Sequence, residues 1–264
     1  MTYSAMPAPF RIGQIVPSSN TTMETEIPAM LRARETIHPQ RFTFHTSRMR
    51  MHRVTPDELA AMNREGLRCA AELADARVDV MSTACLVAIM ATGFGYHRTT
   101  EDDYRRVVAE NGAGSKVMTS AGALIDGLHT LGAKKISLLA PYTRALTDKV
   151  VAYIEHEGIE VIDRLNFSIE DNLEVGRRDP MLLLDDVKRL NIANADAVVL
   201  SACVQMQSLP AIQPAQAMLG VPVTSTSVCT ARKMLDLLEL EPVAPNCGAL
   251  LARAEGPLGR RKVG

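Results

Sequence analysis

Short apolar runs alternate along the chain with longer segments in which apolar residues recur at helical spacing. Strands are expected at 11–16, 42–49, 78–84, 116–121, 135–140, 159–163, 196–202 and 221–227. Helices are expected at 21–34, 56–75, 101–111, 122–131, 143–157, 180–192 and from about 228 onwards. Segments such as VDVMSTA (78–84) suit strands that are buried on both faces. The pattern therefore predicts an α/β fold with mainly parallel sheets covered by helices.

The second half of the chain repeats three segments of the first half in the same order. The pairs are RIGQIVPSSN (11–20) with KKISLLAPYTR (134–144), VDVMSTACLV (78–87) with DAVVLSACVQ (196–205), and GSKVMTS (114–120) with GVPVTST (220–226). In these alignments Pro17 stands opposite Pro141, and Cys85 stands opposite Cys203. Three matches in the same order indicate an internal duplication.

The duplication predicts two similar Rossmann-like subdomains, related by pseudo-twofold symmetry, with an active site in the cleft between them. We expect residues 1–122 to form the first subdomain, with a C-terminal helical segment, 229–264, packed back on it. Residues 123–228 would form the second subdomain. Because ligands of parallel α/β sheets bind beyond the carboxyl ends of the strands, residues that directly follow strands are the candidates for chemistry.

Composition disfavours several classes of function. The 264 residues include 29 basic and 30 acidic side chains, so no overall basic surplus points to nucleic acid or to an anionic membrane. The chain has no Trp, which disfavours a base-stacking surface. No apolar run reaches the ~18 residues that span a bilayer, and the opening MTYSAMPAPF lacks the pattern of a secretion signal. We expect a cytoplasmic enzyme with a small-molecule substrate and neither nucleic acid nor membrane as partner.

The cysteine and glycine patterns bear on cofactors. The five cysteines are scattered, with no CxxC pair and no Cys/His grouping at metal-ligand spacing. The six histidines form no HxH or HExxH pattern and are interpreted as surface or incidental residues. The fingerprints GxGxxG and GxxxxGK[ST] are absent. The sequence therefore predicts no metal site and chemistry without a nucleotide cofactor.

Cys85 and Cys203 are the first candidates for chemistry because each directly follows an apolar strand. If the two halves face each other, the two thiols approach one cleft from opposite sides. Each would lie near the N-terminus of the segment that follows, where free N–H groups and a helix dipole stabilise a thiolate and a bound anion. The alternative is that both are small buried hydrophobic residues, as free cysteines usually are. Three cysteines without a counterpart are interpreted as structural: Cys69 in a helix, Cys229 at the start of one, and Cys247 in a loop.

Polar groups that could hold a carboxylate follow the first strand of each half. PSSNTT (17–22) offers hydroxyl, amide and main-chain N–H groups, although an ordinary helix N-cap explains this segment equally well. Tyr142 takes the equivalent place in the second half, where its hydroxyl could donate to an anion or simply belong to a satellite core. Asn172 is interpreted as a loop amide that spacing does not select.

At these residues the sequence resembles the maleate cis–trans isomerases, which belong to the aspartate/glutamate racemase superfamily. The resemblance runs over roughly 10–250 and is carried by PSSNTTMETEIP (17–28), STACLVA (82–88), APYT (140–143), EDNLEVGR (170–177) and SACVQMQS (201–208). Racemases of the superfamily typically show Asp-Ser-Gly, Cys-Asn-Thr and Gly-Cys-Thr-His where this chain has PSSN (17–20), CLV (85–87) and ACV (202–204). That departure disfavours an α-amino substrate. Arylmalonate decarboxylases, also relatives, usually keep one of the two cysteines.

The resemblance implies that Cys85 is the nucleophile and Cys203 its partner. It implies a dicarboxylate substrate whose carboxylates are bound by the side chains of Asn20, Tyr142 and Asn172 and by main-chain N–H groups near Val87 and Val204. No cofactor is implied, and the family suggests a homodimer. Three other functions remain open: an amino-acid racemase that uses the thiols as an acid/base pair, an arylmalonate decarboxylase-like enzyme, and a dicarboxylate-binding protein without turnover.

The expected chemistry follows from the double bond of maleate, which prevents rotation until it is temporarily removed. A thiolate suits this task because it adds to electron-poor alkenes and leaves again readily. Addition by Cys85 would place negative charge on the neighbouring carbon and on the second carboxylate, where hydrogen-bond donors stabilise it. Cys203 would either protonate and later deprotonate that carbon, or only stabilise the intermediate.

Overall fold

The computed structural model describes residues 8–51, 53 and 55–253. Its strands form two four-stranded sheets in which every pairing is parallel. The first sheet has the order β2-β1-β3-β4, with β1 at Phe10–Pro17, β2 at Phe42–Met49, β3 at Val80–Thr83 and β4 at Lys116–Thr119. The second has the order β6-β5-β7-β8, with β5 at Lys135–Ala140, β6 at Glu160–Asn166, β7 at Ala197–Ser201 and β8 at Val223–Ser225. The identical strand order reflects the duplication, and the predicted parallel α/β fold is confirmed.

Burial on both faces explains why the central strands are mainly apolar. In β1, Ile12, Ile15 and Val16 have no solvent-exposed surface. Ile12 pairs in parallel register with Phe44 of β2 and with Val80 of β3. Gly13 is needed in this strand, because a Cβ there would come within 2.9 Å of the Val78 Cγ2 atom. Such a Cβ would also come within 3.2 Å of the Leu73 Cδ1 atom, so the helix over Pro56–Asp75 lies directly on the sheet.

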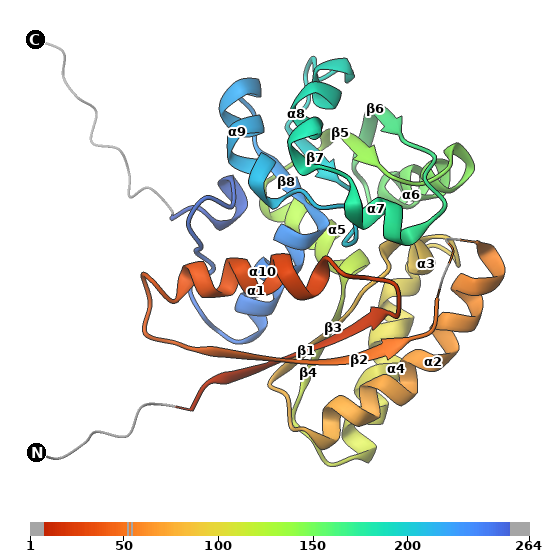
Figure 1. Ribbon diagram of the computed structural model, residues 1–264, viewed down its shortest axis with the longest axis vertical. Coiled ribbons are helices and arrows are strands. Elements are labelled where there is room, and N and C mark those ends of the chain that lie inside the picture. Colours follow the sequence, from red (N-terminus) through yellow and green to blue (C-terminus); the bar gives the residue numbers. More distant parts are fainter. Residues whose placement is uncertain (1–7, 52, 54, 254–264) are drawn as a thin grey trace, which may run out of the picture.

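Helices connect and cover the strands (Figure 1). In the first half they are α1 (Met23–Arg34), α2 (Pro56–Asp75), α3 (Leu86–Met90), α4 (Tyr96–Glu110) and α5 (Ser120–Thr130). In the second half they are α6 (Arg144–His156), α7 (Asn172–Arg177), α8 (Leu183–Asp186), α9 (Leu209–Leu219) and α10 (Thr226–Leu237). Short 3-10 turns lie at Pro180–Leu182, Val187–Arg189 and Ala249–Leu251. Among the described helices, none is both long enough and apolar enough to cross a membrane.

The structure corrects several expected helices. The segment predicted as one helix at 180–192 is divided between α8 and the 3-10 turns on either side of it. Helix α4 begins at Tyr96 rather than at 101, because Gly95 takes a left-handed conformation and starts it. Helices α3, α7 and α9 were not expected. The first two are short, and α9 contains Pro210 and Pro214, which weaken a helical pattern.

The two halves interlock near the middle of the molecule. Helix α10 follows the last strand of the second sheet, yet it packs against α1, β3 and β4 of the first half. Helix α5, which joins the halves, packs on α10. In Figure 1 α1 and α10 lie between the two sheets. The described part of the predicted C-terminal segment thus contacts the first half, and the proposed boundaries at 122 and 229 remain a prediction.

Candidate active site

Cys85 lies at the carboxyl end of β3 and directly precedes α3. Its backbone takes φ +73° and ψ +70°, in the left-handed region that residues other than glycine rarely occupy. Strain of this kind persists only where the surrounding structure imposes it, and it is common at functional sites. The residue is 8% exposed. The fold thus forces this thiol into an orientation that an ordinary strand–helix junction would not give.

Cys203 lies two residues beyond the end of β7, in a buried loop at 202–208. The Ser201 hydroxyl, at the end of β7, donates hydrogen bonds within this loop to the carbonyl oxygens of Cys203 at 2.9 Å and Met206 at 3.0 Å. No helix begins at Cys203, since α9 starts only at Leu209. The expectation that a helix N-terminus follows each thiol is therefore right for Cys85 and wrong for Cys203.

Tyr142 brings the two halves of the site together. Its side chain follows β5 and is 3% exposed. Its hydroxyl lies close enough to the Cys203 thiol and to the backbone N–H of Val87 in α3 for both groups to act on its pKa. Charges on both Cys85 and Cys203 act on it, and burial is the main reason that its pKa lies well above the ordinary value. The predicted residues Cys85, Val87, Tyr142 and Cys203 therefore lie in one cluster.

Burial also determines the protonation of Cys85. Burial, with a smaller contribution from charge on Cys203, raises the pKa of this thiol to about 12. The backbone N–H of Ala88 opposes the shift by stabilising the thiolate, without offsetting it. The expected stabilisation from the helix start is therefore present, but the net shift of the Cys85 pKa is upward. Helix α3 has only five residues, and desolvation outweighs it.

The Cys203 sulfur has more hydrogen-bond donors around it than the Cys85 sulfur. Burial raises its pKa, while the Tyr142 hydroxyl and the backbone N–H groups of Gln205 and Met206 act in the opposite direction. The Gln205 N–H donates to the sulfur at 3.3 Å. Val204, between these two residues, is buried in the same loop. Two sulfurs in one cluster thus have unequal surroundings, which suits unequal chemical roles.

Asn20 both caps a helix and presents a donor. Its Oδ1 accepts hydrogen bonds from the N–H groups of Thr22 at 3.1 Å and Met23 at 2.9 Å, at the start of α1. The N-cap interpretation of PSSNTT is therefore right. Asn20 is 1% exposed, and its Nδ2 makes no hydrogen bond to another residue in the described part of the chain. A buried amide N–H₂ without a partner is available to a ligand.

Asn172 is not a loop residue, because it is the first residue of α7. The Asp171 carboxylate caps this helix by accepting from the N–H groups of Leu173 and Glu174. The Asn172 Nδ2 donates to the Ser19 hydroxyl at 2.9 Å, which links the second half to the segment that carries Asn20. The predicted carboxylate-binding amides thus come from opposite halves and are joined through Ser19.

The remaining cysteines and histidines lie elsewhere. All five thiols are free, and Cys69, Cys229 and Cys247 are buried in α2, in α10 and in a loop. Cys229 is the fourth residue of α10 rather than its start. His97 corrects the expectation of surface histidines, since it is buried and its Nδ1 hydrogen-bonds with the Tyr153 hydroxyl. Within residues 8–51, 53 and 55–253, no group of three or more potential ligands could hold a metal ion.

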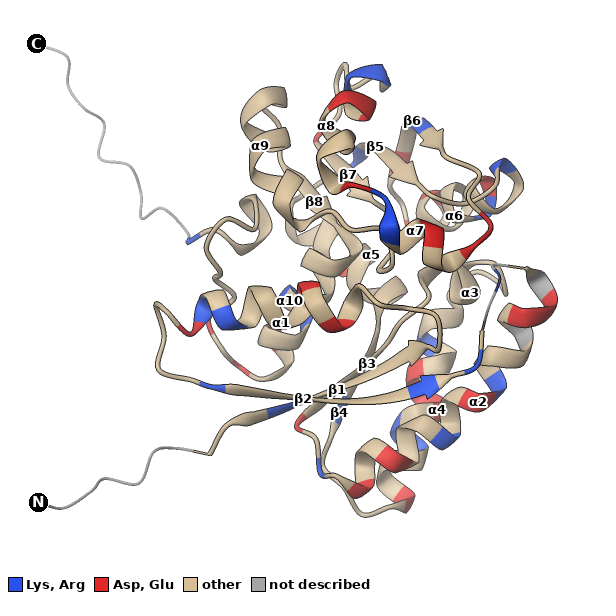
Figure 2. Cartoon of the chain, viewed as in Figure 1, with Lys and Arg blue, Asp and Glu red and all other residues tan. Residues whose placement is uncertain are grey.

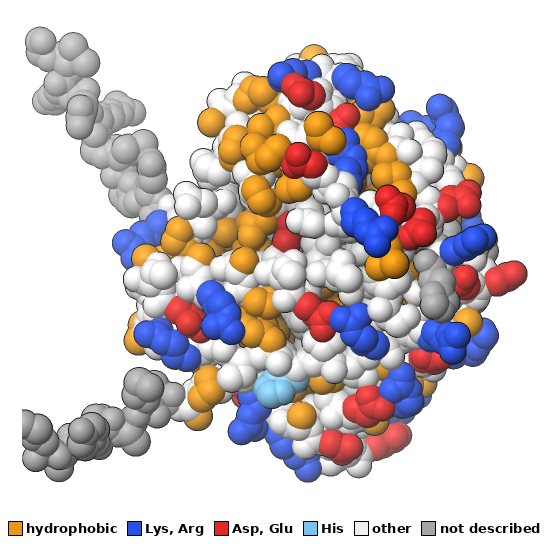
Figure 3. All heavy atoms as spheres, in the orientation of Figure 1, with side chains coloured by type: hydrophobic (Ala, Val, Ile, Leu, Met, Phe, Trp, Pro, Cys, Tyr) orange, Lys and Arg blue, Asp and Glu red, His pale blue; other side chains and the backbone are white. Residues whose placement is uncertain are grey.

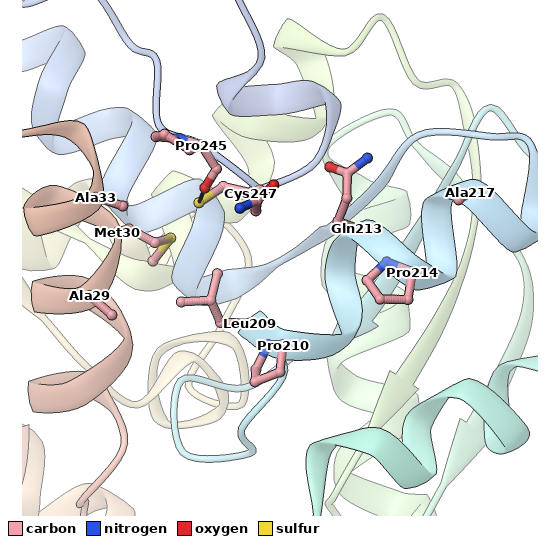
Figure 4. Close-up of a pocket in the computed structure, with 11 residues that line it drawn as sticks. Ala29, Met30, Ala33, Leu209, Pro210, Gln213, Pro214, Ala217, Pro245 and Cys247 are labelled. Atoms are coloured by element: carbon pink, nitrogen blue, oxygen red, sulfur yellow. Dashed lines mark hydrogen bonds between the residues drawn. The ribbon is translucent and has the colours of Figure 1, made fainter. Parts of the chain in front are cut away.

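A separate apolar pocket of about 550 Å³ lies between α1, α9 and the loop at 245–247 (Figure 4). Met30, Leu209 and Cys247 are among its lining residues, and no predicted site residue is. Helix α9 carries no charged side chain (Figure 2). Hydrophobic side chains gather on the surface over this helix (Figure 3). This pocket is an apolar surface feature distinct from the two-cysteine cluster.

Known proteins share this fold and sequence over nearly the whole chain. The arylmalonate decarboxylase family model matches residues 12–251. A maleate isomerase from Geobacillus stearothermophilus is 59% identical over 244 residues, which is 92% of this chain and 97% of that protein. The crystal structure of a Pseudomonas putida S16 maleate isomerase variant with maleate has a TM-score of 0.93 and 53% identity, covering 94% and 99% of the two chains.

A third match bears on covalent chemistry. A cysteine-to-serine mutant of the Nocardia farcinica maleate cis–trans isomerase carries a covalently bound succinylcysteine intermediate. That structure has a TM-score of 0.90 and 42% identity, covering 94% of this chain and all of the other. The two-sheet fold and the family model define the class, and the chain belongs to the arylmalonate decarboxylase family. Within it, the identity to maleate isomerases over more than nine-tenths of both chains makes this protein a member of the maleate isomerase group.

Proposed function

We propose that this protein isomerises maleate to fumarate without a cofactor, with Cys85 as the nucleophile. The observation that carries the proposal is the pair of buried thiols at equivalent strand ends, with Tyr142 acting between them. Membership of the maleate isomerase group supports the substrate and the reaction. The covalent succinylcysteine in the Nocardia farcinica relative supports a thiol adduct as the intermediate.

The first step is addition of sulfur to the double bond. Only one sulfur of the pair is ionised at a time, because charges on both would raise each other's pKa. We assign the reacting charge to Cys85, whose proton leaves to solvent when the site opens to substrate. The thiolate forms a bond to one alkene carbon. The π electron pair moves to the neighbouring carbon and into its carboxylate. The former double bond is then a single bond and can rotate.

Cys203 moves a proton in the steps that follow. Its thiol protonates the carbanion carbon, which gives a succinyl adduct on Cys85 and a thiolate on Cys203. After rotation the Cys203 thiolate removes that proton, the C=C bond forms again, and the carbon–sulfur bond to Cys85 breaks. Both sulfurs return to their starting protonation. The donors around Cys203 suit this role because they stabilise its transient charge.

Neutral donors hold the two carboxylates. We assign this role to the Nδ2 of Asn20, the side chains of Tyr142 and Asn172, and the backbone N–H groups at Val87 and Val204. Fixed neutral donors aimed at developing charge favour the transition state, whereas a fixed cation would bind the ground-state dianion equally strongly. Cys85 is 8% exposed and Cys203 6%, so substrate reaches them only when the covering segments move.

Proton NMR of purified protein with maleate, in buffer without any cofactor, tests this function. Conversion to fumarate by the parent and its loss in Cys85→Ser are the expected results. A folded Cys85→Ser variant that retains turnover would remove Cys85 as the nucleophile. Solvent deuterium entering the α-carbon of aspartate or glutamate would indicate a racemase, and decarboxylation of an arylmalonate would indicate the decarboxylase. Maleate binding without conversion would leave only a binding protein.

We also propose that the protein acts as a homodimer in the cytoplasm. An exposed helix without charge beside an apolar pocket, as in α9, has the composition of an interface core. Five free cysteines suit a reducing compartment. Light scattering on the parent should give twice the chain mass. Met218→Lys adds a charge to the exposed side of α9 and should lower the measured mass. A monomeric parent would exclude the dimer.

A further inference from the structure

Gln205 has a buried side chain that the proposed chemistry does not use. Its side-chain Oε1 accepts hydrogen bonds from the backbone N–H groups of Thr21 at 2.9 Å and Thr22 at 3.3 Å. Its Nε2 donates to the carbonyl oxygens of Asn172 at 2.7 Å and Ser19 at 3.2 Å. The residue is 2% exposed. One side-chain amide therefore bonds to two segments that lie more than 140 residues apart in sequence and belong to opposite halves of the fold.

These four bonds use both acceptor positions and both donor hydrogens of the amide. No hydrogen-bonding capacity remains for a substrate. A direct binding role for this side chain is therefore excluded in this conformation, and its effect on a ligand has to pass through the segments that it joins.

The joined segments are those that carry the proposed substrate-binding groups. Asn20 directly precedes Thr21, and it shares the Thr22 N–H with Gln205. The Asn172 backbone is bonded directly to Gln205. The backbone N–H of Gln205 itself donates to the Cys203 sulfur. A single residue therefore contacts the chain beside both carboxylate-binding amides and one of the two thiols.

Helix α7 packs closely against the Gln205 side chain. A Cβ on Gly176 of α7 would come within 2.5 Å of the Gln205 Nε2 atom and 3.0 Å of the Thr21 Oγ1 atom. Glycine at this position thus allows α7 to approach both residues closely. The neighbouring Gln207 adds a hydrogen bond from its Nε2 to the Gly176 carbonyl oxygen at 2.6 Å. The side chains of Gln205 and Gln207 thus each hydrogen-bond to the backbone of α7 and hold this helix against the loop at 202–208.

We propose that Gln205 is a positioning residue, whose amide sets the separation of Asn20 and Asn172 and thereby fixes the distance between the two carboxylate sites. This proposal rests on the proposed function, because it assumes that these two amides bind the dicarboxylate. Misplacement of binding groups by about 1 Å is enough to lower activity about 10²-fold. Removal of the amide should therefore weaken dicarboxylate binding, even though the amide does not touch the ligand.

The binding test separates positioning from chemistry. Maleate affinity is measured by calorimetry in Cys85→Ser, which keeps the site but lacks the nucleophile, and again in Cys85→Ser with Gln205→Ala. We expect Kd to rise at least tenfold in the double variant. The control is Gln216→Ala in the same background, because the Gln216 Oε1 likewise accepts from two backbone N–H groups, those of Val223 and Ala249. Gln216→Ala should lower the thermal midpoint and leave Kd unchanged. Equal Kd values with and without Gln205 would overturn the proposal.

Gln205→Glu provides a signature that a general loss of stability would not give. An ionised carboxylate accepts from Thr21 and Thr22 but cannot donate to the carbonyl of Asn172, whereas a protonated carboxyl group regains one donor. The kcat/KM of Gln205→Glu relative to the parent should therefore fall about 10²-fold at neutral pH and recover as pH is lowered. A deficit that does not change with pH would contradict the assigned donor role.

Hydrogen exchange distinguishes failure of this proposal from failure of the proposed function. Gln205→Ala should accelerate exchange of the Thr21 and Thr22 amides, whatever the reaction is. If exchange is faster in Gln205→Ala but the parent makes no fumarate, the structural link is retained and the proposed function is rejected. If exchange is unchanged in Gln205→Ala and the parent is active, the structural link is rejected.

Discussion

The hydroxyl of Tyr142 and the sulfur of Cys203 lie close together in the buried interior, where each acts on the pKa of the other. Tyr142 follows β5 and Cys203 follows β7, and these two strands are neighbours in the second sheet. The backbone N–H of Val87 reaches the same hydroxyl from α3. The phenol therefore connects the partner thiol to the helix that begins directly after Cys85.

Replacing Tyr142 with Phe should lower kcat for maleate about 10²-fold, because it removes one preorganised donor from the developing charge. The fold should survive, since the ring remains. Tyr153→Phe is the matched control, because it removes a buried hydroxyl that bonds with His97. That variant should lose stability and keep its kcat. Steady-state kinetics of both variants provide the measurement, and an unchanged kcat in Tyr142→Phe would exclude a catalytic role for the hydroxyl.

The left-handed backbone at Cys85 predicts an inverted order of stabilities. In most positions alanine is more stable than glycine, but here glycine avoids a steric cost of ~1–2 kcal/mol. Cys85→Gly should therefore be more stable than Cys85→Ala by roughly 0.5 kcal/mol of unfolding free energy, after the extra backbone entropy of glycine is included. Urea unfolding of the two variants measures the difference. A clearly more stable alanine variant would contradict imposed strain at this residue.

Alkaline pH should destabilise the protein because several buried acids must stay protonated in the folded state. Burial raises the pKa of Cys85, Cys229 and Cys247 from 9.0 to about 12, and that of Tyr104 from 10.0 to about 12. Their contribution is complete at pH values well below 9 and is lost as pH rises towards 12, because the unfolded chain releases these protons first. Each cysteine accounts for up to about 1.4 kcal/mol per pH unit within that window.

Denaturant titrations between pH 7 and 10.5 measure this loss. The free energy of unfolding should stay level to about pH 8.5 and then fall. Cys229→Ala should show a shallower fall than the parent, because one of the responsible thiols is absent. The same slope in both proteins would exclude Cys229 as a contributor.

Glu26 connects α1 to the loop that carries Cys203. Its Oε1 accepts from the backbone N–H groups of Ser208 at 2.6 Å and Leu209 at 2.7 Å, at the start of α9. Burial raises the pKa of this carboxyl against those two hydrogen bonds. Glu26→Ala should cost at least about 2 kcal/mol of unfolding free energy, since it leaves two buried donors unpaired. Glu26→Gln keeps the acceptor and should cost less. Equal losses in thermal or urea unfolding would contradict a capping role.

Sequence patterns were sufficient for the fold because buried parallel strands are mainly apolar. The strand of 78–84 and its counterpart at 196–202 are visible in this way, and the duplication places the thiols at equivalent ends. The short helices α3 and α7 lack the length over which periodicity can be recognised. The Asp171 cap was a usable signal for α7, because an Asp followed three residues later by Glu marks a helix start.

The candidate site was only partly visible in the sequence. Cys85 and Cys203 follow from the duplication, whereas Asn172 came from the family resemblance. Gln205 was missed because its partners, Ser19 to Thr22 and Asn172, are far away in sequence and only the fold brings them together. The net shift of the Cys85 pKa could not be predicted, because a sequence shows the helix start but not the extent of burial.

Mass spectrometry of peptides from protein quenched during exposure to maleate tests the central claim most directly. We expect Cys203→Ser, which lacks the proposed proton donor and acceptor, to accumulate a succinyl-sized adduct on the peptide that contains Cys85. Cys85→Ser should carry none. An adduct confined to Cys203 in the Cys85→Ser variant, or turnover by that variant, would contradict the assignment of Cys85 as the residue that bonds to the substrate.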